Sequence, residues 1–145
     1  MHTGKSLTVQ NDEIKEGTQI IQSDYQGKDS QKWILRDSHK NGWIISSFVN
    51  SDLSISVKDN IENGARIVLE KTIDNDSQMF YMYNIVQEER TKNDGIYKFS
   101  IGKNPNKVIE IQGGTIENDS EIDIWTYRKC IATKILFRIS KRRIL

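Results

Sequence analysis

Few residues in this chain of 145 could carry nucleophilic or metal chemistry. The two histidines are His2 and His39, and the single cysteine is Cys130. A Cys130–His39 pair is a conceivable nucleophile and base, but no local motif supports it. These three residues form no cluster with the spacing of zinc ligands, so no metal or cofactor is predicted. The abundant carboxylates leave a glycosidase-like pair open, yet without a catalytic motif we predict that the chain is not an enzyme.

An internal repeat must position whatever functional residues the chain has. Three stretches share the form Ile-x-x-Gly/Asp-x-x-Ile, at residues 14–20, 61–67 and 116–122. Each follows an alternating segment, at residues 7–9, 53–55 and 109–111. Fourteen residues after the glycine come Gln31-Lys32-Trp33 in the first copy and Gln78-Met79-Phe80 in the second. We predict that Trp33, Phe80 and, in the third copy, Leu136 are equivalent core residues.

The composition favours strands, since 22 Ile stand against 6 Leu and 2 Ala. Each unit reads as short strands joined by polar turns, and such a unit cannot bury its apolar face alone. We therefore predict an all-β domain over residues 1–145, in which three repeats share one core about a pseudo-threefold axis. The repeats span about residues 1–41, 42–94 and 95–140.

The first repeat is predicted to lack its first strand. The other two copies have apolar segments, 43–45 and 97–99, before the alternating segment, whereas residues 1–6 are short and polar. An incomplete barrel leaves unpaired strand edges, which invite association. We expect another protein domain or chain to complete this repeat, and we expect the basic tail 140–145 to be loosely attached.

The charge balance excludes some partners. A formal net charge of +1, from 21 basic and 20 acidic residues, gives no basic excess of the kind that binds nucleic acid. A mean hydropathy of −0.62, with no long apolar run, predicts no membrane span. The first 20 residues have no apolar signal segment. The high Ile, Lys and Asn content is typical of an AT-rich bacterial genome.

With these landmarks, the chain resembles the ricin-type β-trefoil lectins, a family of carbohydrate-binding modules. The family repeat carries Leu-Asp-Val, then Asn-Gly, then an apolar strand ending in Trp, then Gln-x-Trp. Here Gly17 precedes Gln31-Lys32-Trp33, Gly64 precedes Gln78-Met79-Phe80, and Ile109-Glu110-Ile111 precedes Trp125. The resemblance covers residues 4–140 and implies a β-trefoil fold.

The resemblance implies one altered sugar site, in the third repeat. A pyranose has an apolar face that stacks on an aromatic ring and polar edges that bond to acids and amides. Glu110 stands at the position of the family's acid, Trp125 at that of its ring, and Asp123 at that of an amide. Lys134 replaces the supporting Gln and could pair with Glu110. The first repeat has Thr8 and Ser23 at the acid and ring positions, and the second has Ser54 and Glu70, so neither is predicted to bind sugar in this way.

The resemblance leaves more than one function open. The first is non-catalytic binding of galactose-like saccharides as a module of a larger secreted protein, such as a toxin or a glycoside hydrolase. The second is a structural or protein-interaction β-trefoil that has lost sugar binding. A β-trefoil protease inhibitor is a third possibility, but it needs an exposed reactive loop that the sequence does not reveal. A secreted or extracellular location is expected from the family.

Overall fold

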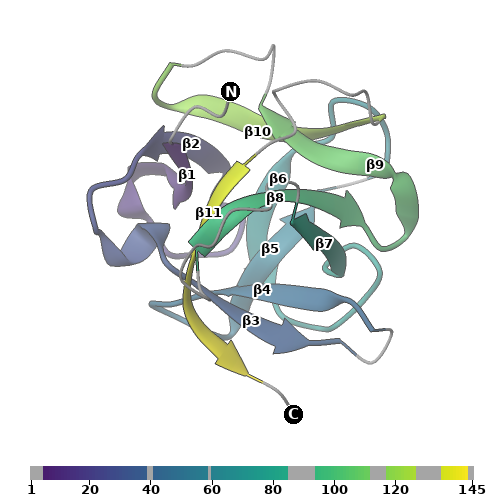
Figure 1. Cartoon of the computed structure of the whole chain (residues 1–145), viewed down its shortest axis with the longest axis horizontal. Coiled ribbons are helices and arrows are strands. Elements are labelled where there is room, and N and C mark those ends of the chain that lie inside the picture. The colour runs from purple at the N-terminus through teal and green to yellow at the C-terminus, as the bar shows by residue number, and fades with distance from the viewer. Residues whose placement is uncertain are drawn as a thin grey trace.

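The computed structural model describes residues 5–38, 41–58, 60–84, 94–111, 117–126 and 135–143. Within these ranges the chain is almost entirely β-structure, wound about a central axis (Figure 1). In the described ranges, regular structure outside the strands is limited to two short 3-10 segments, η1 (Gln10–Asp12) and η2 (Asp29–Gln31). Among the described residues, no helix is long or apolar enough to cross a membrane.

The strands follow the three sequence repeats. The first repeat has β1 (Lys5–Val9), β2 (Ile20–Asp24) and β3 (Trp33–Asp37). The second has β4 (Trp43–Ser47), β5 (Leu53–Val57), β6 (Ile67–Lys71) and β7 (Phe80–Asn84). The third has β8 (Asp94–Ile101), β9 (Asn104–Ile111), β10 (Ser120–Thr126) and β11 (Ile135–Arg143). Among the described residues no strand precedes β1, whereas β4 and β8 open the other two repeats.

Five of these strands close into a barrel, and three hairpins extend from it. The hairpins are β1–β2, β5–β6 and β9–β10, and the ring is made by the pairings β3–β4, β4–β7, β7–β8, β8–β11 and β11–β3. The first four ring pairings are antiparallel and the last is parallel. A closed ring with an odd number of alternating strands must contain one such parallel pair.

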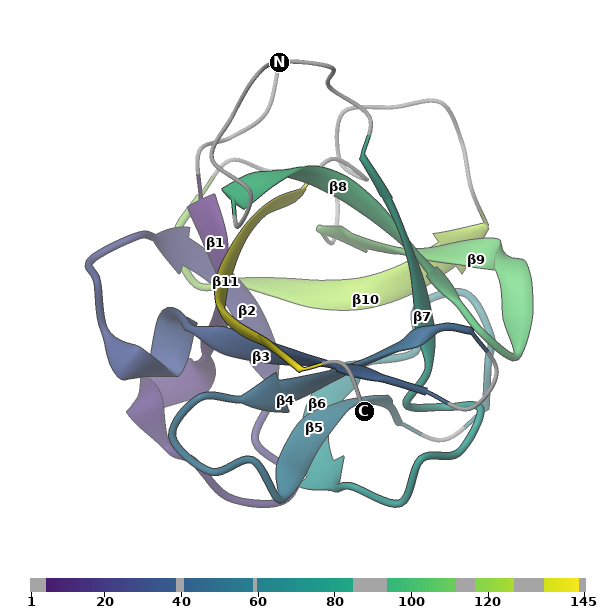
Figure 2. The ribbon, with the colours of Figure 1, turned by 60° about the horizontal axis from the view of Figure 1, so that its bottom comes forward.

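Strand β11 makes the closure that the sequence did not predict. Its first residues, Ile135–Arg138, pair antiparallel with β8, and from Ile139 onward it pairs in parallel with β3. A register shift between Ile139 and Lys141 redirects the strand from one partner to the other, and Figure 2 shows β11 in yellow crossing to β3. The expectation of a loosely attached tail is therefore wrong for residues 140–143, while 144–145 lie outside the described residues.

One apolar core fills the barrel and the hairpin layer. As predicted, Trp33 and Phe80 are fully buried in it, each at the first position of its strand. The indole N–H of Trp33 donates to the Leu7 carbonyl at 3.2 Å, so the ring is buried without an unsatisfied donor. Leu136 lies in β11, where its backbone is in register with Ser6 and Ile96. All-β architecture with threefold pseudosymmetry is thus confirmed, and the fold is a β-trefoil.

The repeats are joined in a cycle by equivalent loops. Gly17, Gly64 and Asp119 each have positive φ, and each donates its backbone N–H to a strand of the next repeat. The acceptors are the carbonyls of Leu69, Ile124 and Gln22, at 2.7, 2.8 and 2.9 Å. These loops therefore join the three repeats around the pseudo-threefold axis. Each loop needs a residue in the left-handed backbone conformation, which Gly adopts without strain.

Candidate functional site

The hairpin of β9 and β10 carries the predicted site in the third repeat. Its core side is formed by Ile109, Ile122 and Ile124, which are all fully buried. Because side chains alternate along a strand, Asp123 and Trp125 share the opposite, outer face. Glu110 is the register partner of Asp123 across the hairpin. The structure thus brings three of the four predicted positions, Glu110, Asp123 and Trp125, to one face of one hairpin.

Asp123 and Trp125 differ in how far they reach solvent. The Asp123 side chain is buried, with 4% of the residue exposed, whereas Trp125 is half-buried. Trp125 lies beside the second repeat, since a Cβ added to Gly64 would be 3.9 Å from Cζ3 of the indole. The second-repeat loop therefore borders the ring, and Trp125 keeps part of its surface exposed.

Two polar residues that the sequence reasoning missed form hydrogen bonds at Thr126, the residue after Trp125. Asn63 accepts a hydrogen bond on Oδ1 from the Thr126 backbone N–H at 2.8 Å, and Lys107 Nζ donates to the same oxygen at 2.5 Å. Lys107 also donates to Thr126 Oγ1 at 3.0 Å. The signal for Asn63 was its place before the glycine of the Asn-Gly turn, which had been assigned a backbone role only. Because Thr126 and Lys107 form the register pair next to Trp125 and Val108, their side chains lie on the other face of the hairpin from the indole.

The remaining sequence-predicted residues lie partly or wholly outside the described parts. The backbone of Glu110 is placed, but its side chain is not described. Lys134 falls outside the described residues, as do His2, His39 and Cys130. Strand β11 begins at Ile135, just as β3 begins at Trp33 and β7 at Phe80. Among the residues that are described, no cluster of His, Cys, Asp or Glu has the arrangement of a metal site.

The second-repeat acid position needs a correction. Thr8 pairs with Ile21 and Glu110 with Asp123, and the matching pair in the second repeat is Ser56 with Val68. Ser54 lies two residues earlier, opposite the ring position Glu70. The assignment of Ser54 to the acid position is therefore wrong by two residues, and the equivalent residue is Ser56. The alternating pattern does not reveal this error, because a shift of two residues leaves every side chain on the same face.

The first two repeats use these positions for internal hydrogen bonds. Thr8 is buried, and its Oγ1 accepts from Gln31 Nε2 at 3.1 Å. In the second repeat Ser56, at the corrected acid position, is buried, and Ser54, opposite the ring position, is buried in a hydroxyl network with Ser46 and Thr72. No carboxylate stands opposite a ring in either hairpin, where Ser23 and Glu70 hold the ring positions. These two outer faces therefore lack the groups that a stacked sugar needs.

Gln31 and Gln78 fix the loops that follow β2 and β6. Gln31 Nε2 donates to the Asp24 carbonyl at 2.7 Å, and Gln78 Nε2 donates to the Lys71 carbonyl at 2.8 Å. Each amide oxygen accepts a backbone N–H within the same loop: Gln31 from Gln26, and Gln78 from Ile73 and Asp74. Both glutamines are 1% exposed, so the Gln-x-aromatic motif positions a loop as well as a core ring.

Electrostatic perturbation is concentrated at the first repeat. Hydrogen bonds from Lys5 Nζ, at 2.7 Å, and from Asn118 lower the pKa of Asp24 below its usual value. Hydrogen bonds from Ser30 and Lys28 likewise lower the pKa of Asp12. Both carboxylates are exposed members of surface pairs, so they contribute to local structure and not to a reactive site.

The sequence comparisons bear on the family. The sequence model of the ricin-type beta-trefoil lectin domain-like family matches residues 1–70. The resemblance to the ricin-type β-trefoil lectins is confirmed. No curated protein sequence matches the chain. The family match covers the first repeat and most of the second, whereas the candidate hairpin lies beyond it.

Solved structures show the same fold over nearly the whole chain. The designed threefold-symmetric protein ThreeFoil has a TM-score of 0.81 at 20% identity, covering 94% of this chain and 92% of that chain. An exo-beta-1,3-galactanase from Clostridium thermocellum has a TM-score of 0.81 at 24% identity, covering 94% of this chain but 28% of that chain. The C-half of an earthworm R-type lectin, in complex with GalNAc, has a TM-score of 0.65 at 17% identity, covering 93% and 91%. At these identities the likeness establishes the fold.

Proposed function

We propose that this β-trefoil is a non-catalytic carbohydrate-binding domain that takes galactose-like sugars at the β9–β10 hairpin. The observation that carries the proposal is the outer face of that hairpin. There Trp125 and Asp123 lie two residues apart on one strand, with Glu110 in register opposite Asp123. Neither of the other two hairpins combines a ring with an acid, so the third repeat is the single site.

The chemistry of this face suits a pyranose. The accessible part of the Trp125 indole stacks on the apolar C–H face of the sugar. The carboxylate at position 110 accepts hydrogen bonds from hydroxyl groups, and buried Asp123 stands in register opposite it. Lys134 either pairs with Glu110 or donates to the sugar. Binding through one such site is weak, and repetition of sites in a larger assembly would strengthen it.

The solved relatives support this choice of ligand and setting. The earthworm lectin was crystallised with GalNAc, and the galactanase acts on a β-1,3-galactan. This chain corresponds to less than a third of the galactanase chain. We propose that this chain is a binding module of a larger secreted protein, such as a glycoside hydrolase or a toxin, and that it contributes no catalytic residue.

One observation favours a second candidate, a structural or interaction β-trefoil. Asp123 is buried, and part of the Trp125 ring is covered by the Gly64 loop. Both side chains therefore also serve the packing of the third repeat against the second. In that case the outer face would be a remnant of a sugar site.

A titration separates the two candidates. Galactose, lactose and N-acetylgalactosamine are added to the protein while Trp fluorescence and backbone NMR shifts are followed, with Trp43→Phe as background so that buried Trp33 is the one tryptophan besides Trp125. Saturable shifts confined to β9 and β10, abolished in Trp125→Ala and retained in Ser23→Ala, support the sugar site. The sugar site is rejected if no saturable response appears up to tens of millimolar sugar, or if folded Trp125→Ala responds as the unchanged protein does. Either result would favour the structural or interaction role. Asp123→Asn serves as a milder variant if Trp125→Ala does not fold.

A further inference from the structure

The barrel has one strand fewer than the threefold pseudosymmetry predicts. In the second and third repeats a barrel strand precedes the hairpin, since β4 precedes β5 and β8 precedes β9, but within the described residues no strand precedes β1. The ring therefore has five strands where three complete repeats would give six. Because β4 lies between β3 and β7 and is antiparallel to both, the sixth strand would lie between β11 and β3 and be antiparallel to both.

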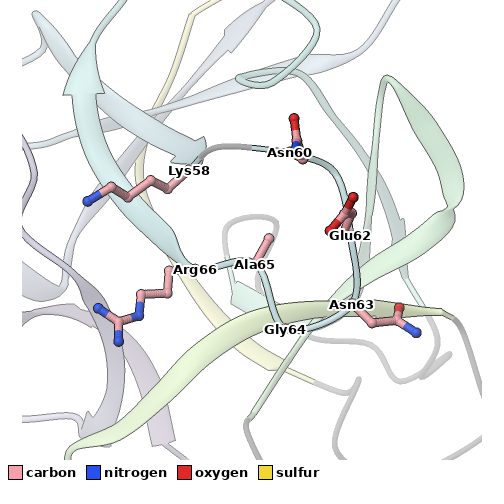
Figure 3. A pocket seen from close by; sticks show the side chains of 7 residues that line it. All are labelled: Lys58, Asn60, Glu62, Asn63, Gly64, Ala65 and Arg66. Atoms are coloured by element: carbon pink, nitrogen blue, oxygen red, sulfur yellow. The ribbon is translucent and has the colours of Figure 1, made fainter.

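The gap is confined to the barrel, because all three hairpins are present. Figure 3 shows the β5–β6 loop, with Gly64, lying against β10 of the third repeat, and the equivalent loops join the other repeats in the same way. The hairpin registers place Ser6, Ser54 and Val108 at equivalent positions, each opposite the ring position of its repeat. Since Ser54 pairs with Ser46 of β4, Ser6 is the residue that a sixth strand would pair with.

The side chain of Ser6 shows what the gap leaves behind. In the second repeat the hydroxyl groups of Ser46 and Ser54 are hydrogen-bonded at 2.8 Å. Ser6 is equally buried, with 1% of the residue exposed, but its Oγ has no hydrogen-bond partner among the described residues. Its register partner is Leu136 of β11, a residue without a polar side-chain atom. A buried hydroxyl without a partner is costly, so Ser6 is suited to a serine on an added strand.

The third repeat lacks the same hydroxyl pair for the opposite reason. Ser100 of β8 is the equivalent of Ser46, but Val108 stands opposite it in β9. The Ser100 hydroxyl is likewise buried and has no partner within the described parts of the chain. In that repeat the strand is present and the hairpin serine is replaced, whereas in the first repeat the hairpin serine is present and the strand is not.

Strand β11 occupies part of the empty position. In the second repeat Trp43 of β4 is the register partner of Phe80, the first residue of β7. Trp33, the first residue of β3, has Ile139 of β11 as its partner at the matching position. The segment Ile139–Arg143 then runs parallel to β3, with a register shift after Ile139, whereas a first strand would run antiparallel. Parallel pairing is slightly less stable per residue, so an antiparallel strand can compete for this edge of β3.

We propose that the barrel accepts a β-strand of a partner polypeptide between β11 and β3, and that this strand displaces Ile139–Arg143 from β3. Main-chain hydrogen bonds supply affinity in such strand addition, and alternate side chains supply specificity. The two first strands of the chain share the required pattern, at residues 43–46 and 97–100: an aromatic residue, then an apolar residue two positions later, then a serine. The apolar residue, Ile45 or Phe99, is fully buried in the core. This strand site lies in the barrel and does not depend on sugar binding at the β9–β10 hairpin.

The test uses a peptide with the sequence of β4. A synthetic peptide of residues 41–49, with a lysine added at each end for solubility, is titrated into the full chain while backbone NMR shifts and amide hydrogen exchange are followed. One matched peptide carries Ser46→Ala, which removes only the hydroxyl, and another carries Ile45→Asp, which brings a carboxylate to the core. The protein variant Ser6→Ala removes the partner hydroxyl, and its folding is checked from the spectra before titration.

The β4 peptide is expected to shift the amides of β1, β3 and β11 saturably. The amides of residues 139–143 are expected to lose exchange protection as they leave β3. The Ser46→Ala peptide is expected to bind about fivefold more weakly, as for the loss of one hydrogen bond. In the Ser6→Ala protein this difference between the two peptides is expected to disappear. The Ile45→Asp peptide is expected not to bind.

Several results would overturn the proposal. These are the absence of saturable binding up to millimolar peptide, equal binding of the Ile45→Asp peptide, and equal binding of the Ser46→Ala peptide to the unchanged protein. Unchanged protection of residues 139–143 in the peptide-bound protein would show that the position between β11 and β3 stays closed. A concentration-dependent dimer that the peptide does not dissociate would assign the position to a second copy of the chain, which also contradicts a partner strand.

Discussion

Asn63 and Thr126 belong to different repeats, yet Asn63 Oδ1 accepts a hydrogen bond from the Thr126 backbone N–H at 2.8 Å. The same contact recurs around the axis, where Asn118 Oδ1 accepts from the Asp24 N–H at 3.0 Å and Glu16 Oε1 accepts from the Lys71 N–H at 3.2 Å. In each loop the accepting residue immediately precedes the residue with positive φ. One turn thus supplies both a backbone donor and a side-chain acceptor to the next repeat.

Asn63→Ala is expected to destabilise the fold by about 1 kcal/mol, the net value of one such hydrogen bond at a site that water can reach. The substitution removes the acceptor of the Thr126 N–H and of Lys107 Nζ together. Chemical denaturation monitored by Trp fluorescence measures the change. Asn60→Ala is the matched control, since Asn60 lies in the same loop and its side chain makes no described hydrogen bond. Equal loss of stability in both variants would contradict the bracing role.

Gly17→Ala is expected to cost about 1–2 kcal/mol because an L side chain at φ of +85° is strained. No atom lies within 4 Å of an added Cβ, so the backbone alone is tested. Gly17→Asn is expected to recover much of the loss, because the third repeat itself places Asp119 in this conformation at φ of +63°. Thermal unfolding of the two variants checks the order. If Ala is tolerated as well as Asn, strain at this turn is not what selects glycine.

The repeat made part of this architecture predictable from the sequence. Periodic Ile residues and the Gln-x-aromatic landmarks identified an all-β threefold fold, and they placed Trp33 and Phe80 correctly in the core. The hairpin register of the second repeat was not predictable. Residues 53–57 alternate throughout, as Leu-Ser-Ile-Ser-Val, and a slip of two positions preserves that pattern. Only the cross-strand partner Val68 identifies Ser56 as the equivalent of Glu110.

Two other features of the structure were not predicted from the sequence: the pairing of β11 with β3, and the contact that the Asn63 side chain makes with the next repeat. The parallel β11–β3 pair joins segments about 100 residues apart, and no local pattern specifies such a partner. Asn63 was assigned a turn because its neighbour Gly64 is the stronger local signal, although its side chain serves the next repeat. For the site, sequence similarity chose Glu110, Asp123 and Trp125, and the hairpin register puts them on one face. Their binding of sugar stays a prediction.

Gln78→Leu is expected to cost about 2–3 kcal/mol, the range for leaving buried polar groups without partners. The amide of Gln78 holds the N–H groups of Ile73 and Asp74 and the carbonyl of Lys71. Leucine has nearly the same volume, so lost packing contributes little. Gln26→Ala is the control: its side chain is exposed, and only its backbone N–H bonds to Gln31. A change in Gln78→Leu no larger than in the control would mean that water replaces the amide.

Acid is expected to weaken the junction of the first and third repeats through Asp24. Because Lys5 and Asn118 lower its pKa in the folded state, ionised Asp24 stabilises the fold at pH values above its unfolded pKa of about 3.9. That stabilisation is lost as the pH falls through the lower, folded pKa. Asp24→Asn is expected to flatten this part of the stability profile between pH 5 and about pH 2. Denaturation midpoints across this range, together with NMR titration of the Asp24 carboxyl, measure it. A folded pKa at or above the unfolded value would contradict the contact.

Removal of residues 139–145 is expected to open the barrel at β3. Strand β11 contributes the pairing at Trp33, Ile34, Leu35 and Arg36, so a chain ending at Arg138 leaves this edge of β3 without its neighbour. Losing several ladder hydrogen bonds costs about 3 kcal/mol, and the freed edge favours association between chains. Hydrogen exchange at the amides of β3 and the mass in solution measure the two effects. Removal of residues 144–145 alone serves as the control, because the pairing with β3 ends at Arg143. Unchanged protection of β3 in the shorter chain would show that β11 does not close the ring.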